Sequence, residues 1–230
     1  MMTSNYPVEQ KSTTNGNIYS DQPLLVRIIA HFFSFIFHPL FIPLYATWYL
    51  AFVHPYYFVG FAPSIKLWVL LRVCLNMIFF PALTVFLLKA IGFIDSIFLK
   101  TQKDRIIPII ASNLFFFWMY LVFRNQQEIP TILTSFTFGV FLASSFALLA
   151  NIYIRISLHA IGVGGLLGLF LVITYTNPAI PVTLPLMASI LLTGLICTSR
   201  MIVGKHTQAE IYFGIIIGLV SQILASWFLL

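Results

Sequence analysis

The stretch TSRMIVGKHTQAE, Thr198 to Glu210, separates two long apolar runs, 181–198 and 208–229. The chain as a whole has only 8% charged residues and is 60% hydrophobic, whereas a soluble domain has roughly 25% charged residues. A soluble fold could not bury this much apolar surface, so the sequence predicts a membrane protein. The charged or titratable side chains of the stretch are Arg200, Lys205, His206 and Glu210.

Apolar runs near the length of about 20 residues that crosses a bilayer as a helix recur along the chain. No alternating strand pattern is present, so an all-α polytopic membrane helix bundle of six to seven spans is predicted. The first run contains His38-Pro39 and Pro43, and we expect it to be kinked or partly re-entrant. We expect a flexible polar tail over 1–23 and a single transmembrane helical domain over 24–230. The candidate spans are 24–53, 66–91, 106–123, 131–152, 158–176, 181–198 and 208–229.

Two of these spans carry a small residue at every fourth position. One has Ala160, Gly164 and Gly168, and the other has Gly214 and Gly218. Faces of small residues let membrane helices approach closely. We therefore predict that these glycines serve helix packing.

Three loops, 92–105, 153–157 and 199–207, share one membrane face if the spans alternate in direction. Ionisable groups near a membrane are costly, so their concentration there predicts a functional site. Lys and Arg suit a phosphate because they form charge-assisted hydrogen bonds with it, and helix starts near 158 and 208 add free N–H groups. The cluster and the helix starts after it contain Lys100, Lys103, Asp104, Arg105, Arg155, Ser157, His159, Arg200, Lys205, His206 and Glu210.

The two histidines of this cluster allow a division of labour. One can attack phosphorus while the other protonates the departing oxygen. Glu210 lies one helical turn after His206, on the same face, where it could orient the ring. The spacing Ser199-Arg200-x5-His206-x3-Glu210 resembles the third signature of the type 2 phosphatidic acid phosphatase (PAP2) superfamily, Ser-Arg-x5-His-x3-Asp.

Two further stretches resemble the other PAP2 signatures. Ile156-Ser157-Leu158-His159 keeps the serine and histidine of the second signature, Pro-Ser-Gly-His. Lys100-x4-Arg105, followed by Pro108, stands where the first signature, Lys-x6-Arg-Pro, is expected. The resemblance covers about residues 95–225 and implies a PAP2-like helical core in that region.

The resemblance implies a metal-independent lipid phosphatase that needs no cofactor. His206 would be the nucleophile and form a phospho-histidine, Glu210 would orient it, and His159 would be the general acid. The expected phosphate-binding residues are Arg200, Ser157, Lys100 and Arg105, with Lys103, Arg155 and Lys205 as further candidates.

The expected substrate is a lipid phosphate: a polyprenyl (di)phosphate, a phosphatidate-type lipid or a lipid A headgroup. The excess of 12 Lys and Arg over 6 Asp and Glu fits anionic headgroups rather than nucleic acid. We expect a bacterial inner (cytoplasmic) membrane. Lys and Arg number nine on the motif face and three on the other, which favours a cytoplasmic motif face, whereas membrane members of the family usually work on the outer side. The orientation and the oligomeric state stay open.

Structural readings stand beside these roles. Thr207-x-x-Glu210 is also a capping box, and Arg200 and Lys205 could anchor headgroups at the interface. His159 could cap a helix or face water, and Lys100, Lys103 and Arg105 could be ordinary loop charges.

Two other functions remain as alternatives. The departures from the first and second PAP2 signatures favour a catalytically degenerate relative that binds anionic lipid or a membrane partner. A small-solute transporter is a third option, although paired broken helices at mid-membrane are not evident. We assign no chemistry to His31, His38 and His54, which we expect to lie far from the motifs.

Overall fold

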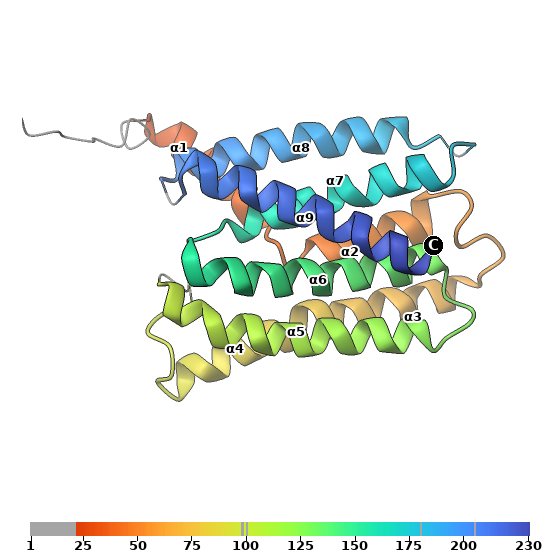
Figure 1. Ribbon diagram of the computed structural model, residues 1–230, viewed down its shortest axis with the longest axis horizontal. Helices are drawn as coiled ribbons and strands as arrows, with labels where there is room; N and C mark the ends of the chain where they lie inside the picture. The colour runs from red at the N-terminus through yellow and green to blue at the C-terminus, as the bar shows by residue number, and fades with distance from the viewer. Residues whose placement is uncertain (1–21, 98, 100, 180, 205) are drawn as a thin grey trace, which may run out of the picture.

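The computed structural model describes residues 22–97, 99, 101–179, 181–204 and 206–230. The described part of the chain is all helical, without a strand (Figure 1). The predicted tail, 1–23, falls outside it except for its last two residues. The helices are α1 (Leu24–Ile36), α2 (Ile42–Trp48), α3 (Pro63–Cys74), α4 (Phe80–Ala90), α5 (Gln102–Arg124), α6 (Thr131–Tyr153), α7 (Leu158–Thr176), α8 (Thr183–Ile202) and α9 (Gln208–Leu229), with π-helical turns η1 (Tyr49–Val53) and η2 (Leu75–Phe79).

Six helical stretches among the described residues are long and apolar enough to cross a membrane. The prediction of a membrane helix bundle is confirmed at this level. The spans predicted over 158–176 and 208–229 coincide with α7 and α9. The six stretches are Pro63–Ala90, which joins α3, η2 and α4, and the helices α5, α6, α7, α8 and α9.

The first apolar run, 24–53, is broken. The helix α1 ends at Ile36, and α2 begins at Ile42 and continues into η1. Both pieces are shorter than the roughly 20 residues of a spanning helix, yet they follow one another along the bundle (Figure 1). The break lies at Pro39, because a proline disfavours helical backbone in the residue before it. The predicted kink is confirmed.

In two helices, α5 and α8, an extension beyond the predicted span moves candidate residues. The helix α5 begins at Gln102 rather than 106, because Thr101 and Asp104 form a capping box. Lys103 and Arg105 therefore lie in a first helical turn and not in a loop. The helix α8 continues to Ile202 and ends before Gly204, whose φ of 68° suits a glycine. Arg200 accordingly belongs to its last turn.

The helices α7 and α9 pack with almost no space between their backbones. A Cβ added at Gly214 would lie 2.8 Å from Ala160 Cβ and 2.9 Å from the Ser157 carbonyl oxygen, and one at Gly218 would meet the Ile161 carbonyl oxygen. The predicted packing role of these small residues is confirmed. The same approach places the two helix starts together: the Ser157 N–H donates to the Glu210 carbonyl at 3.4 Å.

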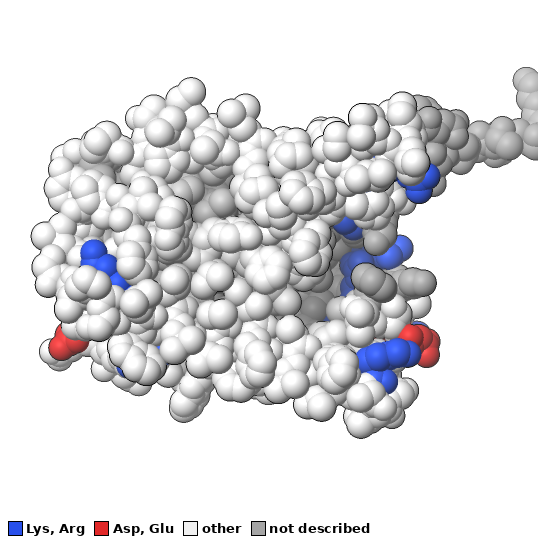
Figure 2. All heavy atoms as spheres, turned by 180° about the vertical axis from the view of Figure 1, so that it is seen from behind, with Lys and Arg blue, Asp and Glu red and all other residues white. Residues whose placement is uncertain are grey.

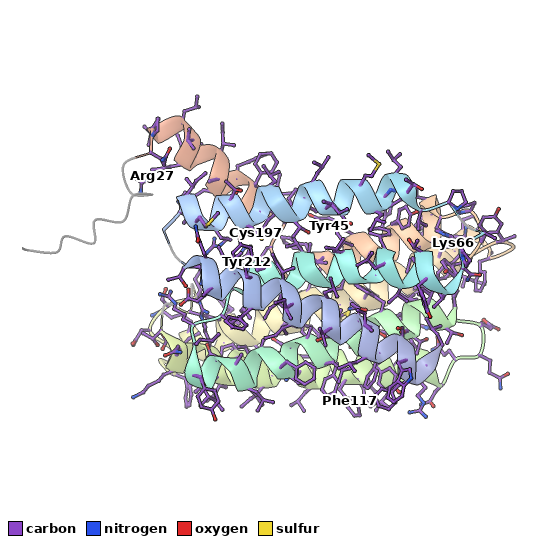
Figure 3. The ribbon with its side chains drawn as sticks, turned by 45° about the horizontal axis from the view of Figure 1, so that its top comes forward. Arg27, Tyr45, Lys66, Phe117, Cys197 and Tyr212 are labelled. Atoms are coloured by element: carbon purple, nitrogen blue, oxygen red, sulfur yellow. The ribbon has the colours of Figure 1, made fainter. Side chains whose placement is uncertain are left out.

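On the face that Figure 2 shows, the Lys, Arg, Asp and Glu side chains lie near the two ends of the bundle. Figure 3 shows α1 leaning away from the bundle at one end, with Arg27 near its tip, and Lys66 at the opposite end. The starts of α5, α7 and α9 and the ends of α6 and α8 lie at the end that holds α1 (Figure 1). Alternation of the helices thus brings the three predicted motifs to one end.

Candidate functional site

A cavity of about 1320 Å³ lies inside the bundle at the end that carries the motifs. Residues of α1, α4, α5, α6 and α7 build most of its wall, and most of them are apolar. Figure 2 shows Lys and Arg atoms inside a hollow at this end of the molecule, near α1. The cavity therefore joins an apolar interior to a basic mouth. Five residues predicted for the site line it: Arg105, Arg155, His159, Arg200 and His206.

His206 lies between α8 and α9 and is held by two oxygen atoms. Its Nδ1 is 3.1 Å from Glu210 Oε2 and 3.2 Å from the carbonyl oxygen of Arg155. Both partners are acceptors, so Nδ1 must carry the hydrogen of a neutral ring. Nε2 is then the nitrogen with the lone pair. This tautomer is the one that a nucleophilic histidine needs.

Glu210 has both of the roles that its spacing predicts. Oε2 accepts from the Thr207 N–H at 3.0 Å, which closes the capping box of α9. The same oxygen accepts from His206 Nδ1. One carboxylate oxygen therefore starts the helix and orients the ring.

The environment of His206 keeps its ring neutral. The side chain is 3% exposed. Burial, followed by the positive charge of Arg200, lowers the pKa of His206 to about 4, while the hydrogen bond to Glu210 acts in the opposite direction. At neutral pH the Nε2 lone pair is thus available to an electrophile.

His159 lies in the first turn of α7 and lines the same cavity. Its Nε2 is 3.0 Å from the carbonyl oxygen of Ser34 in α1. A carbonyl can only accept, so Nε2 carries a hydrogen and Nδ1 is the nitrogen that remains to exchange a proton with a ligand. Arg200 and His206 are both near enough to interact electrostatically with the His159 ring.

Three arginines converge on the mouth of the cavity, close enough for their charges to interact. Arg105 is partly engaged: its Nε donates to the Leu99 carbonyl and its Nη1 to the Ile156 carbonyl, both at 3.1 Å. The Nε atoms of Arg155 and Arg200 are buried and have no hydrogen-bond partner among the described residues. Buried donors without partners are costly, and unpaired cations near them favour an anion. The arrangement fits a phosphate.

The structure does not bring all the predicted phosphate ligands to the cavity. Ser157 is fully buried, does not line the cavity, and accepts from the Ala160 N–H at 3.4 Å as the N-cap of α7. Lys103 is exposed and also does not line it. Lys100 and Lys205 lie outside the described residues.

One expectation about the remaining histidines is wrong. His38 was expected to lie far from the motifs, yet its ring meets the His159 ring edge to face with centroids 5.3 Å apart. His31 also lines the cavity, whereas His54 stacks on Tyr57 and does not. Sequence distance was misleading because the break at Pro39 turns the chain toward α7. The available signal was an ionisable residue inside an apolar run, which is itself a functional indication.

No three His, Cys, Asp or Glu side chains are grouped as a metal ion would need within the described ranges. Comparison with known proteins gives no match: no family model, no curated protein and no solved structure is similar to the chain. The chemistry of the site must therefore be inferred from its own geometry.

Proposed function

We propose that this protein is an integral membrane phosphatase that removes phosphate from a lipid through a phospho-histidine intermediate, as the PAP2 resemblance implies. The observation that carries the proposal is the oriented, neutral His206 at the mouth of a cavity where buried arginine donors lack partners. The three arginines supply the charge that would hold the phosphate. The proposed substrate is a polyprenyl (di)phosphate, a phosphatidate-type lipid or a lipid A headgroup.

The first step is attack on phosphorus by the Nε2 lone pair of His206. A P–N bond forms and the P–O bond to the lipid breaks. The departing oxygen takes a proton from Nδ1 of doubly protonated His159, whose second proton is favoured by the charge of the bound phosphate. Glu210 stabilises the positive charge that develops on the His206 ring.

The second step releases the phosphate. Water attacks phosphorus as His159, now neutral, accepts one of its protons. The P–N bond breaks and its electron pair returns to His206 Nε2. Both histidines then regain their starting protonation states, and inorganic phosphate leaves.

The shape of the cavity supports a lipid as the substrate. The wall reaches Gln222, which at 1.5 Å per residue lies about 20 Å along α9 from the start of that helix. Most of the wall between that depth and the basic mouth is apolar. A water-soluble phosphate ester would leave this surface empty, whereas a hydrocarbon chain would fill it.

A second candidate is a non-enzymatic protein that binds anionic lipid. The engagement of Ser157 as a helix cap and of Arg105 with two backbone carbonyls favours it. Two of the predicted phosphate ligands then have structural roles. This candidate predicts anionic-lipid binding that weakens when Arg200 is neutralised, with no turnover.

The test is phosphate release by purified protein in mixed micelles without added metal, on a panel of the three lipid classes. We expect release by wild type and a loss of more than about 10³-fold in His206→Ala and His206→Asn. The asparagine variant keeps a polar group near Glu210 but has no Nε2. Size-exclusion profiles and thermal unfolding would check that both variants are folded.

Labelled substrate should also leave an acid-labile phospho-enzyme on wild type that is absent from His206→Asn. Equal activity of wild type and both variants would refute the catalytic role of His206. Binding of the lipids by wild type without release or label would establish the second candidate instead.

A further inference from the structure

His159 is contacted by a part of the chain that lies outside the region of the PAP2 resemblance, 95–225. Ser34 and His38 belong to the broken first segment, and both line the cavity beside His159. The Ser34 carbonyl oxygen is 3.0 Å from His159 Nε2, and the His38 ring meets the His159 ring at 5.3 Å. The general acid of the proposed reaction is thus held from two sides by one segment.

The Ser34 carbonyl is free to accept because α1 ends early. In an uninterrupted helix, the N–H of His38 would donate to the carbonyl four residues before it, which is that of Ser34. Here the His38 N–H donates to the Phe35 carbonyl at 3.3 Å instead. Pro39 disfavours helical backbone at His38, so the last carbonyls of α1 accept hydrogen bonds from donors outside the helix. His159 takes one of them, and the Tyr45 hydroxyl donates to another, that of Ile36, at 2.9 Å.

The His38 ring is itself held by the backbone of the break. Its Nδ1 accepts from the Leu40 N–H at 3.4 Å, so the hydrogen of the neutral ring lies on Nε2. Burial and the charge of Arg200 lower the pKa of His38 to about 4, which keeps the ring uncharged at neutral pH. An uncharged aromatic ring in edge-to-face contact restricts rotation of its neighbour.

We propose that His38 is a positioning residue for His159: together with the Ser34 carbonyl, it fixes the His159 ring in the Nε2–H tautomer and leaves Nδ1 for the ligand. The first segment thereby completes the site. The orientation of the ring stands on the contacts alone, while its consequence for the reaction rate rests on the proposed function.

Nitrogen NMR of protein labelled with ¹⁵N-histidine in detergent micelles tests the orientation without any substrate. The signals of His159 are identified by their loss in His159→Asn. We expect wild type to show the Nε2–H tautomer at His159, and His38→Ala to show a mixture of tautomers. His38→Phe keeps a ring of similar size at the same place, so it should preserve the wild-type pattern. An unchanged His159 pattern in His38→Ala would overturn the proposal.

Kinetics on the lipid substrate tests the consequence. Loss of an ordered ring next to a reacting group can displace it by about 1 Å, which costs on the order of 100-fold. We expect His38→Ala to lower kcat by about 10- to 100-fold with KM changed less than about 2-fold, and His38→Phe to recover most of that loss. A kcat of wild-type size in His38→Ala, or a phenylalanine variant no better than the alanine variant, would overturn the positioning role.

The two experiments separate the failure of one proposal from the failure of the other. If wild type releases no more phosphate than His206→Asn, the proposed function fails, and the NMR result still decides whether His38 positions His159. If wild type is active and the His38 variants behave like it in both experiments, only the further inference fails.

Discussion

The helices α7 and α9 meet backbone to backbone, whereas α4 packs mainly on α5 and on the π turn before it. In the most apolar 18-residue window of α7, 61% of the residues are buried, whereas in that of Pro63–Ala90 only 22% are buried. His159, His206 and Glu210 all sit at the start of the tightly packed pair, while α4 forms an outer wall of the cavity. The contrast indicates a division between a rigid half, the α7–α9 pair that carries the candidate reacting groups, and a loosely held half, represented by α4, that the proposed lipid would contact.

The largest effect should come from forcing the rigid pair apart. In Gly218→Val the added side chain meets the Ile161 carbonyl and the Gly165 N–H. We expect a loss of about 3 kcal/mol or more of folding free energy, with loss of activity. Thermal unfolding in detergent measures it. The matched control is Gly194→Val in α8, where an added Cβ meets nothing within 4 Å. If both variants lose the same stability, the close packing of α7 and α9 is not what holds the site.

A smaller effect should follow from removing the charge inside the rigid half without disturbing its packing. Glu210→Gln keeps an oxygen for the Thr207 N–H but has no negative charge to stabilise the His206 ring. We expect kcat to fall by about 10- to 100-fold, because the His206 ring would be held and stabilised less well in its productive geometry, while the thermal midpoint changes little. A loss of stability as large as that of Gly218→Val would mean that Glu210 acts mainly as a helix cap.

The pH profile of this variant checks the same charge. Neutral His206 is the proposed nucleophile, so the acid limb of the wild-type kcat/KM profile, where activity falls with falling pH, should lie near the His206 pKa of about 4. Glu210 raises that pKa through its hydrogen bond and its charge. Glu210→Gln should therefore move the acid limb to lower pH. A limb that moves upward would contradict the stabilisation of the protonated His206 ring by Glu210.

A moderate effect is expected from the outer wall. Val85 in α4 lines the cavity, and Val85→Trp should narrow it where a hydrocarbon chain would lie. We expect KM for a long-chain lipid to rise about 5-fold, which corresponds to about 1 kcal/mol, with kcat on a short-chain phosphate unchanged. Leu87→Trp on the same helix is the control, because Leu87 is 52% exposed and does not line the cavity. Equal effects of the two tryptophans would remove α4 from the binding site.

The smallest effect should come from a cation at the far end of the bundle. Arg124 is the last residue of α5, whose first turn holds Arg105, and its Nη1 donates to the Tyr120 hydroxyl at 3.0 Å. Arg124→Gln should change activity by less than about 2-fold, because Arg124 does not line the cavity and lies at the opposite end of α5 from Arg105. Phosphate release by Arg105→Gln and Arg124→Gln would be compared directly. Similar losses in both would show that net charge, rather than the basic mouth, matters.

Much of the fold and part of the site were predictable from local patterns. Apolar length predicted the spanning helices, and Thr207 with Glu210 predicted the start of α9 together with the contact of Glu210 on His206. The start of α5 was missed because polar side chains at Thr101 and Asp104, rather than an apolar run, begin that helix.

The tertiary parts of the site were not predictable in this way. Ser157 looked like a phosphate ligand, but the close approach of α7 and α9 buries its side chain. The contact between His38 and His159 joins residues that are far apart in the chain. A local sequence pattern does not indicate the direction in which a broken helix continues. Only the folded structure could therefore reveal the contact between His38 and His159.

The early end of α1 has a consequence for how such a site would vary among related sequences. The group that anchors His159 is a main-chain oxygen, which no side-chain exchange at position 34 can delete. Substitution at position 34 would therefore leave the hydrogen bond to His159 intact. Substitution of Pro39 would instead allow α1 to continue, and the His38 N–H would then donate to the Ser34 oxygen. Shared ancestry would then be visible as a retained proline at position 39 and not as a retained residue at position 34.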